Sequence, residues 1–448
     1  MPKKKTALTI EERLQQALVP AEEQPYEVPE NWVWVRLESV ASWGSGGTPS
    51  RKHEEYYNGD ILWIKTGELN NGWLYDTEEK ITDEGLKKSS AKLFPPYSVL
   101  IAMYGATIGK VAILGVPATT NQACACAVCN QSLLYMYLFY YCISQKNVFI
   151  EKGKGGAQPN ISQIILKQHP IPLPPLSEQQ RIVERIEELF AKLDEAKERL
   201  QEVADSFAVR KAAILHKAFT GELIGKQVTE LVPLENLVDL IKIGPFGSSL
   251  HESDYIENGI PLVNPKHIVQ QRIVPQSKIS ISDEKAEELS SYKLKENDIV
   301  LGRRGEMGRC APISNREENW ICGTGSMIIR LKKEYDAKLY SLILGSQATV
   351  TYLENSAVGS TLKNLNEKIV RKIPVPQFSN EEQHEIVRLI DELLARERAA
   401  QQAAEQALAS IDLMKKSILA RAFRGELGTN KASEASALEL LKQVLAEN

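Results

Sequence analysis

Four of the chain's six cysteines lie close together, at Cys124, Cys126, Cys129 and Cys142. Thiolates at such spacing can bind zinc, and Cys126 with Cys129 forms one C-x-x-C pair. A tetrahedral site needs a second C-x-x-C or H-x3-H pair, and the sequence offers neither. Cys124 and Cys126 are two residues apart, which places both on one face of a strand. We therefore interpret the four as reduced, buried strand cysteines and expect no metal site.

A second stretch with possible chemistry is FPPY, from Phe94 to Tyr97. It looks like the tetrapeptide with which amino-methyltransferases hold a target amine, but in those enzymes the first residue is Asp, Asn or Ser. Phe94 cannot accept the hydrogen bond from the amine. We interpret FPPY as a turn before a strand over Ser98–Met103.

Other signatures of catalysis are also missing from the sequence. It contains no G-x-x-x-x-G-K-[ST], H-E-x-x-H or G-x-S-x-G pattern, and GSGGTP at 44–49 does not fit G-x-G-x-x-G. We therefore predict that the chain is not an enzyme.

The composition is that of a globular protein, with 43% hydrophobic and 25% charged residues. A net charge of −4 argues against a protein that coats nucleic acid without specificity, but it allows a local basic site. No apolar run is long enough to span a bilayer, and the charged start MPKKKTALTIEER does not resemble a secretory signal. We expect a cytoplasmic protein without membrane contact.

The chain contains a long internal repeat. KAFTGEL at 217–223 returns as RAFRGEL at 421–427. IPLPPLSEQQRIVERIEELF at 171–190 matches IPVPQFSNEEQHEIVRLIDELL at 373–394, with two extra residues in the second copy, and SVLIAMYGATIGKVAI at 98–113 matches DIVLGRRGEMGRCAPI at 298–313. The order is the same in both copies, and a period of about 200 residues suits a duplicated module rather than a solenoid.

Each copy has a mixed part followed by a helical part. The mixed parts contain β-branched runs and glycine turns, which predicts α+β domains with short strands. The helical parts contain no internal proline or glycine. Ser177 and Ser379 are the expected N-caps, with Gln180 and Glu382 completing capping boxes.

The helices show the spacing of a coiled coil. Steps of four and three connect the apolar or small residues Ile182, Ile186, Leu189, Leu193, Ala196, Leu200, Val203 and Phe207. The second helix offers Ile386, Ile390, Leu393 and Ile411, with Ala400, Ala404 and Ala407 between them. Phe219 and Phe423 should fill the last turns, and Gly221 and Gly425 should end the helices. This predicts antiparallel pairing; the alternative is two separate amphipathic helices, each on its own domain.

Two non-identical domains on a rigid spacer suit a target with helical periodicity. Duplex DNA presents equivalent grooves about 34 Å apart, so two such domains could read two half-sites separated by a fixed gap.

The repeated motifs, together with ALVPAEEQPYEVPENWVWVRL near the start and GELGTNKASEASALELLKQVL near the end, resemble the specificity subunit of type I restriction–modification systems over essentially the whole chain. The resemblance implies an N-terminal helical segment at 1–30, a target recognition domain at 31–175, a central helix at 176–225, a second target recognition domain at 226–377, and a C-terminal helix and tail at 378–448. An N-terminal helix near Glu11–Leu18 could pair with a C-terminal helix near Leu438–Leu445.

The resemblance also implies partners and cofactors. A chain of this family carries no cofactor itself. It binds double-stranded DNA and docks two modification subunits, which use S-adenosylmethionine to methylate adenine. Two restriction subunits, where present, use ATP and magnesium. The alternatives are a self-contained DNA methyltransferase or nuclease and a coiled-coil scaffold without a DNA role.

Polar and basic side chains on glycine-rich loops are the candidates for DNA contact, because arginine and amide side chains read base edges and cations bind phosphates. In the first domain these are Thr48, Ser50, Arg51, Lys65, Thr66, Tyr104, Lys110, Lys154, Gln158 and Asn160. In the second they are Ser248, Ser249, Asn264, Lys266, His267, Arg303, Arg304, Arg309, Lys363 and Asn364. For Arg303 and Arg304, the alternatives to a base contact are an ion pair with a carboxylate such as Glu306 and a contact with a phosphate.

Overall fold

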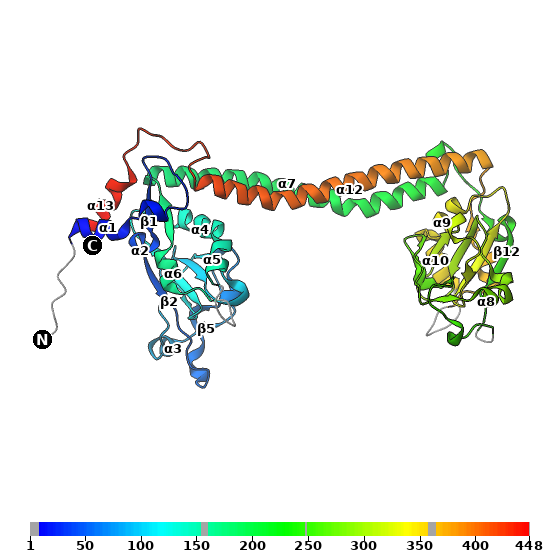
Figure 1. The fold of residues 1–448 in the computed structure, drawn as a ribbon, viewed down its shortest axis with the longest axis horizontal. Helices are drawn as coiled ribbons and strands as arrows, with labels where there is room; N and C mark the ends of the chain where they lie inside the picture. Colours follow the sequence, from blue (N-terminus) through cyan, green and yellow to red (C-terminus); the bar gives the residue numbers. More distant parts are fainter. Residues whose placement is uncertain (1–8, 154–159, 247–248, 357–363, 448) are drawn as a thin grey trace. The chain divides into compact units, whose positions relative to one another are not determined.

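The computed structural model describes residues 9–153, 160–246, 249–356 and 364–447 (Figure 1). The chain forms two compact units. The first unit comprises Met1–Leu200 with Ala407–Asn448, and the second unit comprises Gln201–Gln406. The ends of the chain therefore build one unit together, and its middle builds the other.

The first unit contains two sheets and a short strand pair. The larger sheet has the order β2 (Ala41–Ser45), β9 (Cys124–Cys129), β6 (Val99–Ala102), β7 (Val111–Leu114) and β4 (Trp73–Leu74), and the smaller has β5 (Lys80–Ile81), β3 (Tyr57–Ile64) and β8 (Thr119–Thr120). β1 (Val33–Arg36) pairs antiparallel with β10 (Pro170–Leu173). The helices are α1 (Ile10–Ala17), α2 (Leu37–Val40), α3 (Asp83–Lys87), α4 (Tyr135–Ser144), α5 (Lys146–Lys152), α6 (Gln163–Gln168) and α13 (Ala437–Glu447).

The second unit repeats most of this topology, with four strands in its larger sheet and one additional strand pair. Its larger sheet has the order β12 (Val238–Ile243), β20 (Ser326–Leu331), β17 (Asp298–Gly302) and β18 (Cys310–Pro312), and its smaller has β16 (Ser280–Ile281), β13 (Ile260–Val263) and β19 (Ile321–Cys322). β11 (Val232–Pro233) pairs with β21 (Pro374–Val375), and β14 (Ile268–Val269) with β15 (Arg272–Ile273). The helices are α8 (Asp283–Glu288), α9 (Ala337–Leu344), α10 (Gln347–Ser356) and α11 (Glu367–Arg371). The duplicated mixed α/β module is thereby confirmed.

Two long helices, α7 (Leu176–Phe219) and α12 (Asn380–Ala422), contribute to both units. In the first unit Lys415 of α12 forms an ion pair with Asp194 of α7, and in the second Arg210 of α7 forms one with Glu397 of α12. The contacts move toward the end of α7, from Asp194 to Arg210, as they move toward the start of α12, from Lys415 to Glu397. The two helices therefore run antiparallel, as expected. Along the expected seam Ile182, Ile186 and Phe207 are buried, but Val203 is 43% exposed, because the neighbouring Ala204 takes the inward position.

The helix starts differ from expectation in one copy. Ser379 forms the predicted capping box, since its hydroxyl accepts from Glu382 N and its own N–H donates to the Glu382 carboxylate. Ser177 is not an N-cap, because α7 already begins at Leu176, where Pro175 O accepts from Glu178 N. The helix ends agree with expectation: Gly221 and Gly425 adopt φ of +80° and +75°, and Phe423 is buried against Tyr137 and Tyr141.

A buried glutamine fixes each long helix to its own module. The side-chain amide of Gln179 donates to Ser132 O and Pro174 O and accepts from Leu134 N. Gln383 makes the matching bonds to Glu334 O, Phe378 O and Asp336 N. The two glutamines therefore occupy equivalent positions, as do Gly221 and Gly425. The residues of each pair are 204 positions apart. The expectation that the second copy contains two extra residues is therefore wrong, and Ile171 matches Val375 rather than Ile373.

The N- and C-terminal helices pack together in the first unit. Ala17 of α1 and Leu441 of α13 belong to one buried cluster, and Arg13 Nη1 donates to Leu445 O at 3.2 Å. The pairing that the sequence left open is thus present in the structure.

Three of the four clustered cysteines lie in a strand, as the sequence predicts, and the fourth does not. Cys124, Cys126 and Cys129 are in strand β9, and burial raises the pKa of Cys126 to about 12, so its thiol stays protonated. Cys142 is buried in helix α4 and is not a strand residue, because the apolar run around it forms a helix. Phe94 and Tyr97 precede β6, as the turn interpretation of FPPY predicts.

Candidate nucleic-acid interface

Each unit has a glycine turn between two neighbouring antiparallel strands of its larger sheet. Between β6 and β7, Ala102 N donates to Lys110 O at 2.9 Å, and between β17 and β18, Gly302 N donates to Arg309 O at 2.8 Å. Gly105, Gly109, Gly305 and Gly308 all have positive φ, which an ordinary L-residue rarely adopts. These bonds show that Lys110 and Arg309 occupy matching positions, although the second turn is one residue shorter.

A second strand segment closes against each turn. Ile161 N donates to Met103 O in the first unit, and Leu365 N donates to Arg303 O in the second. Tyr104 is bridged to Asn160 in the same way that Arg304 is bridged to Asn364. Four of the candidate residues are therefore brought together in two equivalent pairs, although they are far apart in sequence.

The two neighbouring arginines have different environments. Arg303 takes the place of the buried Met103 and is itself 6% exposed, with its Nε donating to Leu365 O at 3.1 Å. Burial and the adjacent Arg304 lower the pKa of Arg303. Arg304 is exposed. The candidate carboxylate Glu306 forms its ion pair with Arg309, whose Nη1 also lies 3.4 Å from Pro265 O.

The turn after β3 and the turn after β13 form a second matched pair. In η3 (Thr66–Glu68) the Glu68 carboxylate accepts from Lys65 N at 2.7 Å, and in η8 (Pro265–His267) His267 Nδ1 lies 3.2 Å from Asn264 N. Thr66 is half-buried and Lys266 is exposed. The two modules thus place different side chains on the same backbone turn.

His267 lies inside the second unit rather than on its surface. It is 1% exposed, with Nδ1 at 2.8 Å from Leu262 O, and Nε2 has no hydrogen-bond partner among the described residues. Burial lowers the pKa of His267, so the ring is neutral near pH 7.

A charged cluster in the first unit joins two further candidates. The Glu79 carboxylate lies 2.7 Å from Arg51 and 2.9 Å from Lys65, and the hydrogen bond from Arg51 is the main reason why the pKa of Glu79 is lowered. Arg51 also lies over the Tyr57 ring at 4.4 Å. Sequence reasoning missed Glu79, because no periodic signal connects it to residues 28 and 14 positions earlier.

The remaining candidates are less connected. Thr48 is exposed and hydrogen-bonded to Gln122, and Ser50 is exposed. Lys110 is half-buried. Ser249 is exposed and donates its N–H to Phe246 O, apart from the matched turns. Lys154, Gln158, Ser248 and Lys363 lie outside the described residues.

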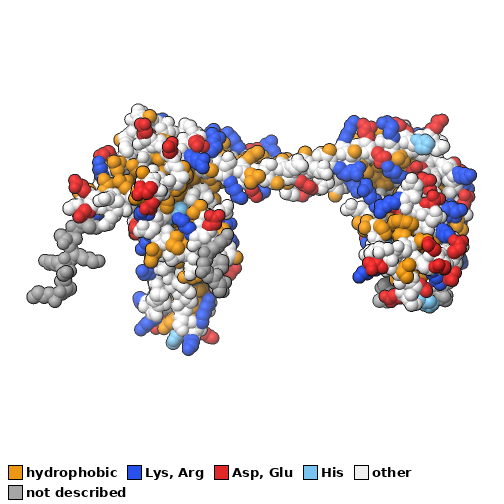
Figure 2. All heavy atoms as spheres, in the orientation of Figure 1, with side chains coloured by type: hydrophobic (Ala, Val, Ile, Leu, Met, Phe, Trp, Pro, Cys, Tyr) orange, Lys and Arg blue, Asp and Glu red, His pale blue; other side chains and the backbone are white. Residues whose placement is uncertain are grey.

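Charge is mixed on the surface of each unit. Figure 2 shows Lys and Arg side chains interspersed with Asp and Glu on the visible face of each. Over the described part of the chain, no group of three or more His, Cys, Asp or Glu side chains could hold a metal ion. Within those same residues, no helix is both long enough and apolar enough to cross a membrane.

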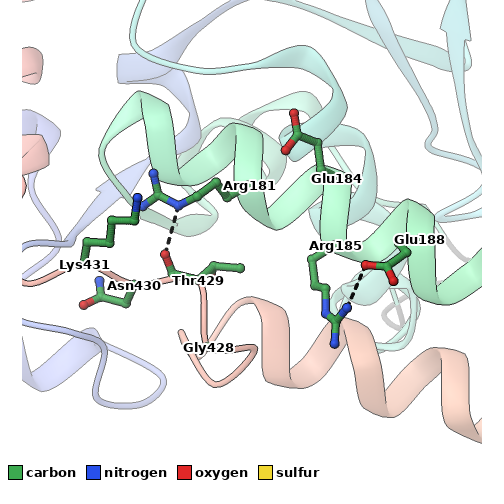
Figure 3. A pocket seen from close by; sticks show the side chains of 8 residues that line it. All are labelled: Arg181, Glu184, Arg185, Glu188, Gly428, Thr429, Asn430 and Lys431. Atoms are coloured by element: carbon green, nitrogen blue, oxygen red, sulfur yellow. Dashed lines mark hydrogen bonds and ion pairs between the residues drawn. The ribbon is translucent and has the colours of Figure 1, made fainter.

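The first unit also has a shallow polar hollow of about 300 Å³ between α7 and the segment after α12 (Figure 3). Arg181 Nε donates to Thr429 O there, and its guanidinium forms a two-pronged ion pair with Glu434. Arg185 pairs with Glu188 at 2.7 Å. These arginines already have partners, so the hollow holds the returning segment in place and contains no evident reacting group.

The chain thus contains two non-identical copies of one mixed α/β module, joined by two long antiparallel helices. The model of the type I restriction modification DNA specificity domain matches residues 29–205 and 235–407. The chain therefore belongs to the family of type I restriction–modification specificity subunits, as the sequence resemblance indicated.

Similar proteins agree with this assignment. The type I restriction enzyme EcoBI specificity subunit of Escherichia coli is 25% identical over 94% of this chain and 93% of its own length. The MjaIX specificity subunit of Methanocaldococcus jannaschii is 28% identical over 62% of this chain and 68% of its own length. In fold, the chain resembles the HsdS subunit from Thermoanaerobacter tengcongensis with a TM-score of 0.64 at 20% identity, covering 90% of this chain and 100% of that one.

Proposed function

We propose that this chain is a non-catalytic subunit that reads a bipartite DNA site, with one half-site for each recognition module. The observation that carries the proposal is the set of matched turns with unmatched side chains. Met103, Tyr104 and Lys110 of the first unit correspond to Arg303, Arg304 and Arg309 of the second. A common backbone that presents different donors and acceptors suits two different base sequences.

The chemistry of the turns supports a division between base and phosphate contacts. The exposed guanidinium of Arg304 can donate two hydrogen bonds to guanine, and Tyr104 offers a ring and one hydroxyl at the same place. Lys110 and Arg309 end the turns at matching positions, where a cation serves for phosphate contact. The positive φ of the turn glycines allows the backbone to approach DNA closely.

The long helices are proposed to dock two modification subunits. One structural relative of this chain is described in a study of complex assembly in a type I restriction–modification system. In such a complex S-adenosylmethionine would supply the methyl group for adenine, and restriction subunits, where present, would use ATP and magnesium. This chain would contribute DNA recognition and subunit docking without catalysis, in the cytoplasm.

Single-molecule sequencing of DNA modification in the host, with and without the gene, tests this proposal. We expect one asymmetric, gapped motif with methylated adenine to disappear on deletion. An unchanged methylome, together with failure of the chain to co-purify with a modification subunit, would refute the proposal.

A further inference from the structure

Four aromatic rings gather on one side of the first unit. Trp73 and Tyr75 come from β4 and its end, Tyr97 from the FPPY turn and Tyr135 from the start of α4. The Trp73 ring lies 6.1 Å from Tyr75, 6.1 Å from Tyr97 and 5.9 Å from Tyr135, and Tyr97 lies 5.0 Å from Tyr135. We call these four residues the aromatic patch.

Two rings of the patch are exposed to solvent, while Trp73 and Tyr135 are half-buried and pack against the core of the unit. Tyr75 is 63% exposed and Tyr97 is 56% exposed, whereas the unit's core tyrosines, Tyr137 and Tyr141, are almost fully buried. Isolated exposed aromatics are common, but several in mutual contact form an apolar surface that water solvates poorly.

Backbone strain indicates that Tyr97 is kept for a reason other than folding. Its φ is +68°, a region that is unfavourable for a bulky side chain. The matching residue of the second unit is Asn297 with φ +67°, since Tyr97 N donates to Leu114 O as Asn297 N donates to Ile313 O. Asparagine adopts this conformation at a lower conformational free energy than tyrosine does. The first unit therefore has a less favourable residue at a position where asparagine is compatible with the same fold.

The second unit does not repeat the patch. Tyr135 follows Leu134, whose N–H donates to Gln179, and Ala337 follows Asp336, whose N–H donates to Gln383. Alanine and asparagine thus stand where the first unit has two tyrosines. The patch is a feature of one module and not of the common frame.

The charge beside the patch is negative. Glu187 of α7 is exposed, and its charge adds to burial in raising the pKa of Tyr140 and, after burial and Tyr97, that of Tyr135. Asp76 follows Tyr75 and pairs with Lys80 at 3.1 Å. A phosphate backbone would be repelled by Glu187, whereas a protein surface with apolar side chains and a lysine or arginine would complement both features.

We propose that the aromatic patch and Glu187 form a docking surface for a modification subunit on the first unit. The partner surface would place apolar side chains against Tyr75 and Tyr97 and a cation near Glu187. This inference rests on the proposed function, because the same helix α7 that carries Glu187 is proposed to dock that subunit. Its consequence is that the two modification subunits dock to the two units with different affinities.

The test uses the full-length chain and the purified modification subunit, with binding measured by titration calorimetry. The variants are Tyr97→Asn, Tyr75→Ser, their double variant, and Glu187→Lys, with Ile256→Ser as a matched control at an exposed apolar residue of the second unit. Tyr97→Asn introduces the residue of the second unit, so its melting temperature should equal or exceed that of the wild type.

We expect the double variant to weaken one of two binding events by about tenfold or more, as is typical of aromatic interface residues. Glu187→Lys should weaken the same event, and Ile256→Ser should change neither. Affinities of the patch variants within twofold of the wild type would overturn the inference. Weaker DNA binding by the assembled complex with unchanged subunit affinity would overturn it in favour of a nucleic-acid contact. A wild-type chain that binds no modification subunit would instead refute the docking part of the proposed function.

Discussion

A buried ion pair in the second unit provides a sharp test of the internal repeat. Asp298 of β17 is 1% exposed and accepts two hydrogen bonds at 2.7 Å from Arg330 of β20, which lies directly opposite. The first unit has no such pair: Ser98 precedes Val99, the match of Ile299, and Val128 follows Ala127, the match of Ile329. The change to make is Arg330→Val, alone and together with Asp298→Ser.

The expected loss follows from what remains buried. Removal of one partner of a buried pair typically costs about 3–5 kcal/mol, because the other charge stays behind without compensation. The Arg330 side chain is 26% exposed, so water can partly replace it, and we take the lower end, about 3 kcal/mol. That corresponds to roughly a hundredfold rise in the opening of the second unit. The double variant copies the first unit and should lie within about 1 kcal/mol of the wild type.

Hydrogen exchange measured by mass spectrometry can report on each unit separately. Peptides from β17 and β20 should exchange faster by two decades in Arg330→Val and return toward the wild-type rate in the double variant, while peptides from β6 and β9 serve as the internal control. Equal destabilisation in the single and double variants would show that the free energy resides in packing rather than in the unpaired carboxylate, and would refute the reasoning.

Three further predictions concern reading, pH and the helix anchors. Arg304→Tyr, which copies Tyr104, should change the base preference in one half-site of the methylated motif and leave the other half-site intact. Arg303→Met, which copies the buried Met103, should preserve the motif and alter only the extent of methylation. Identical motifs and identical extents of methylation in the two variants would contradict this prediction. His169 is 3% exposed, and its pKa is lowered from 6.5 to about 3, mainly by burial and also by Lys152. Between these two values the unfolded chain binds a proton at His169 and the folded chain does not, so acid favours unfolding. The contribution of neutral His169 to the stability of the first unit should therefore be complete above pH 6.5 and should fall by about 2 kcal/mol at pH 5. Tryptophan fluorescence can follow this loss, since five of the six tryptophans lie in that unit, and His169→Ile, which copies Ile373, should flatten the pH dependence below 6.5. Gln383→Leu should destabilise the second unit by about 3 kcal/mol, since it leaves Glu334 O, Phe378 O and Asp336 N without their partner, and a thermal melt that does not shift would count against that anchor.

The duplicated architecture could be predicted from the sequence because it depends on local signals that occur twice. Helix-ending glycines such as Gly221 and Gly425, and the apolar spacing from Ile182 onward, are properties of neighbouring residues. The register of the repeat is harder to predict, because two proline-rich segments of similar composition, IPLPPL and IPVPQF, match best at a spacing two residues short of the true one. The equivalent hydrogen bonds of Gln179 and Gln383 show that the spacing is 204 there too, the same as between Gly221 and Gly425.

The candidate site was predictable in part for the same reason. The glycine spacing predicts that a turn precedes Lys110 and Arg309, because glycines with positive φ leave a sequence signature. The sequence does not distinguish Arg303 from Arg304, since burial depends on which of two adjacent side chains points inward, and that is fixed by the pairing with Leu365 from 62 residues away. The ion pairs of Glu79 with Arg51 and Lys65 are likewise tertiary contacts, and the sequence around Glu79 contains no local signal for them.

The pairing of α1 with α13 makes the path of the chain nearly circular. Arg13 and Leu445 are in direct contact, and the segment that follows α7 in the second unit has its counterpart in the segment that follows α12 in the first: Lys226 binds Glu382 as Asn430 binds Glu178. The order of the two modules in the sequence then depends only on where the N- and C-termini lie along this path. A gene that joins the two terminal helices by a short linker and opens between residues 226 and 231 would encode the same molecule with its recognition modules in the reverse order.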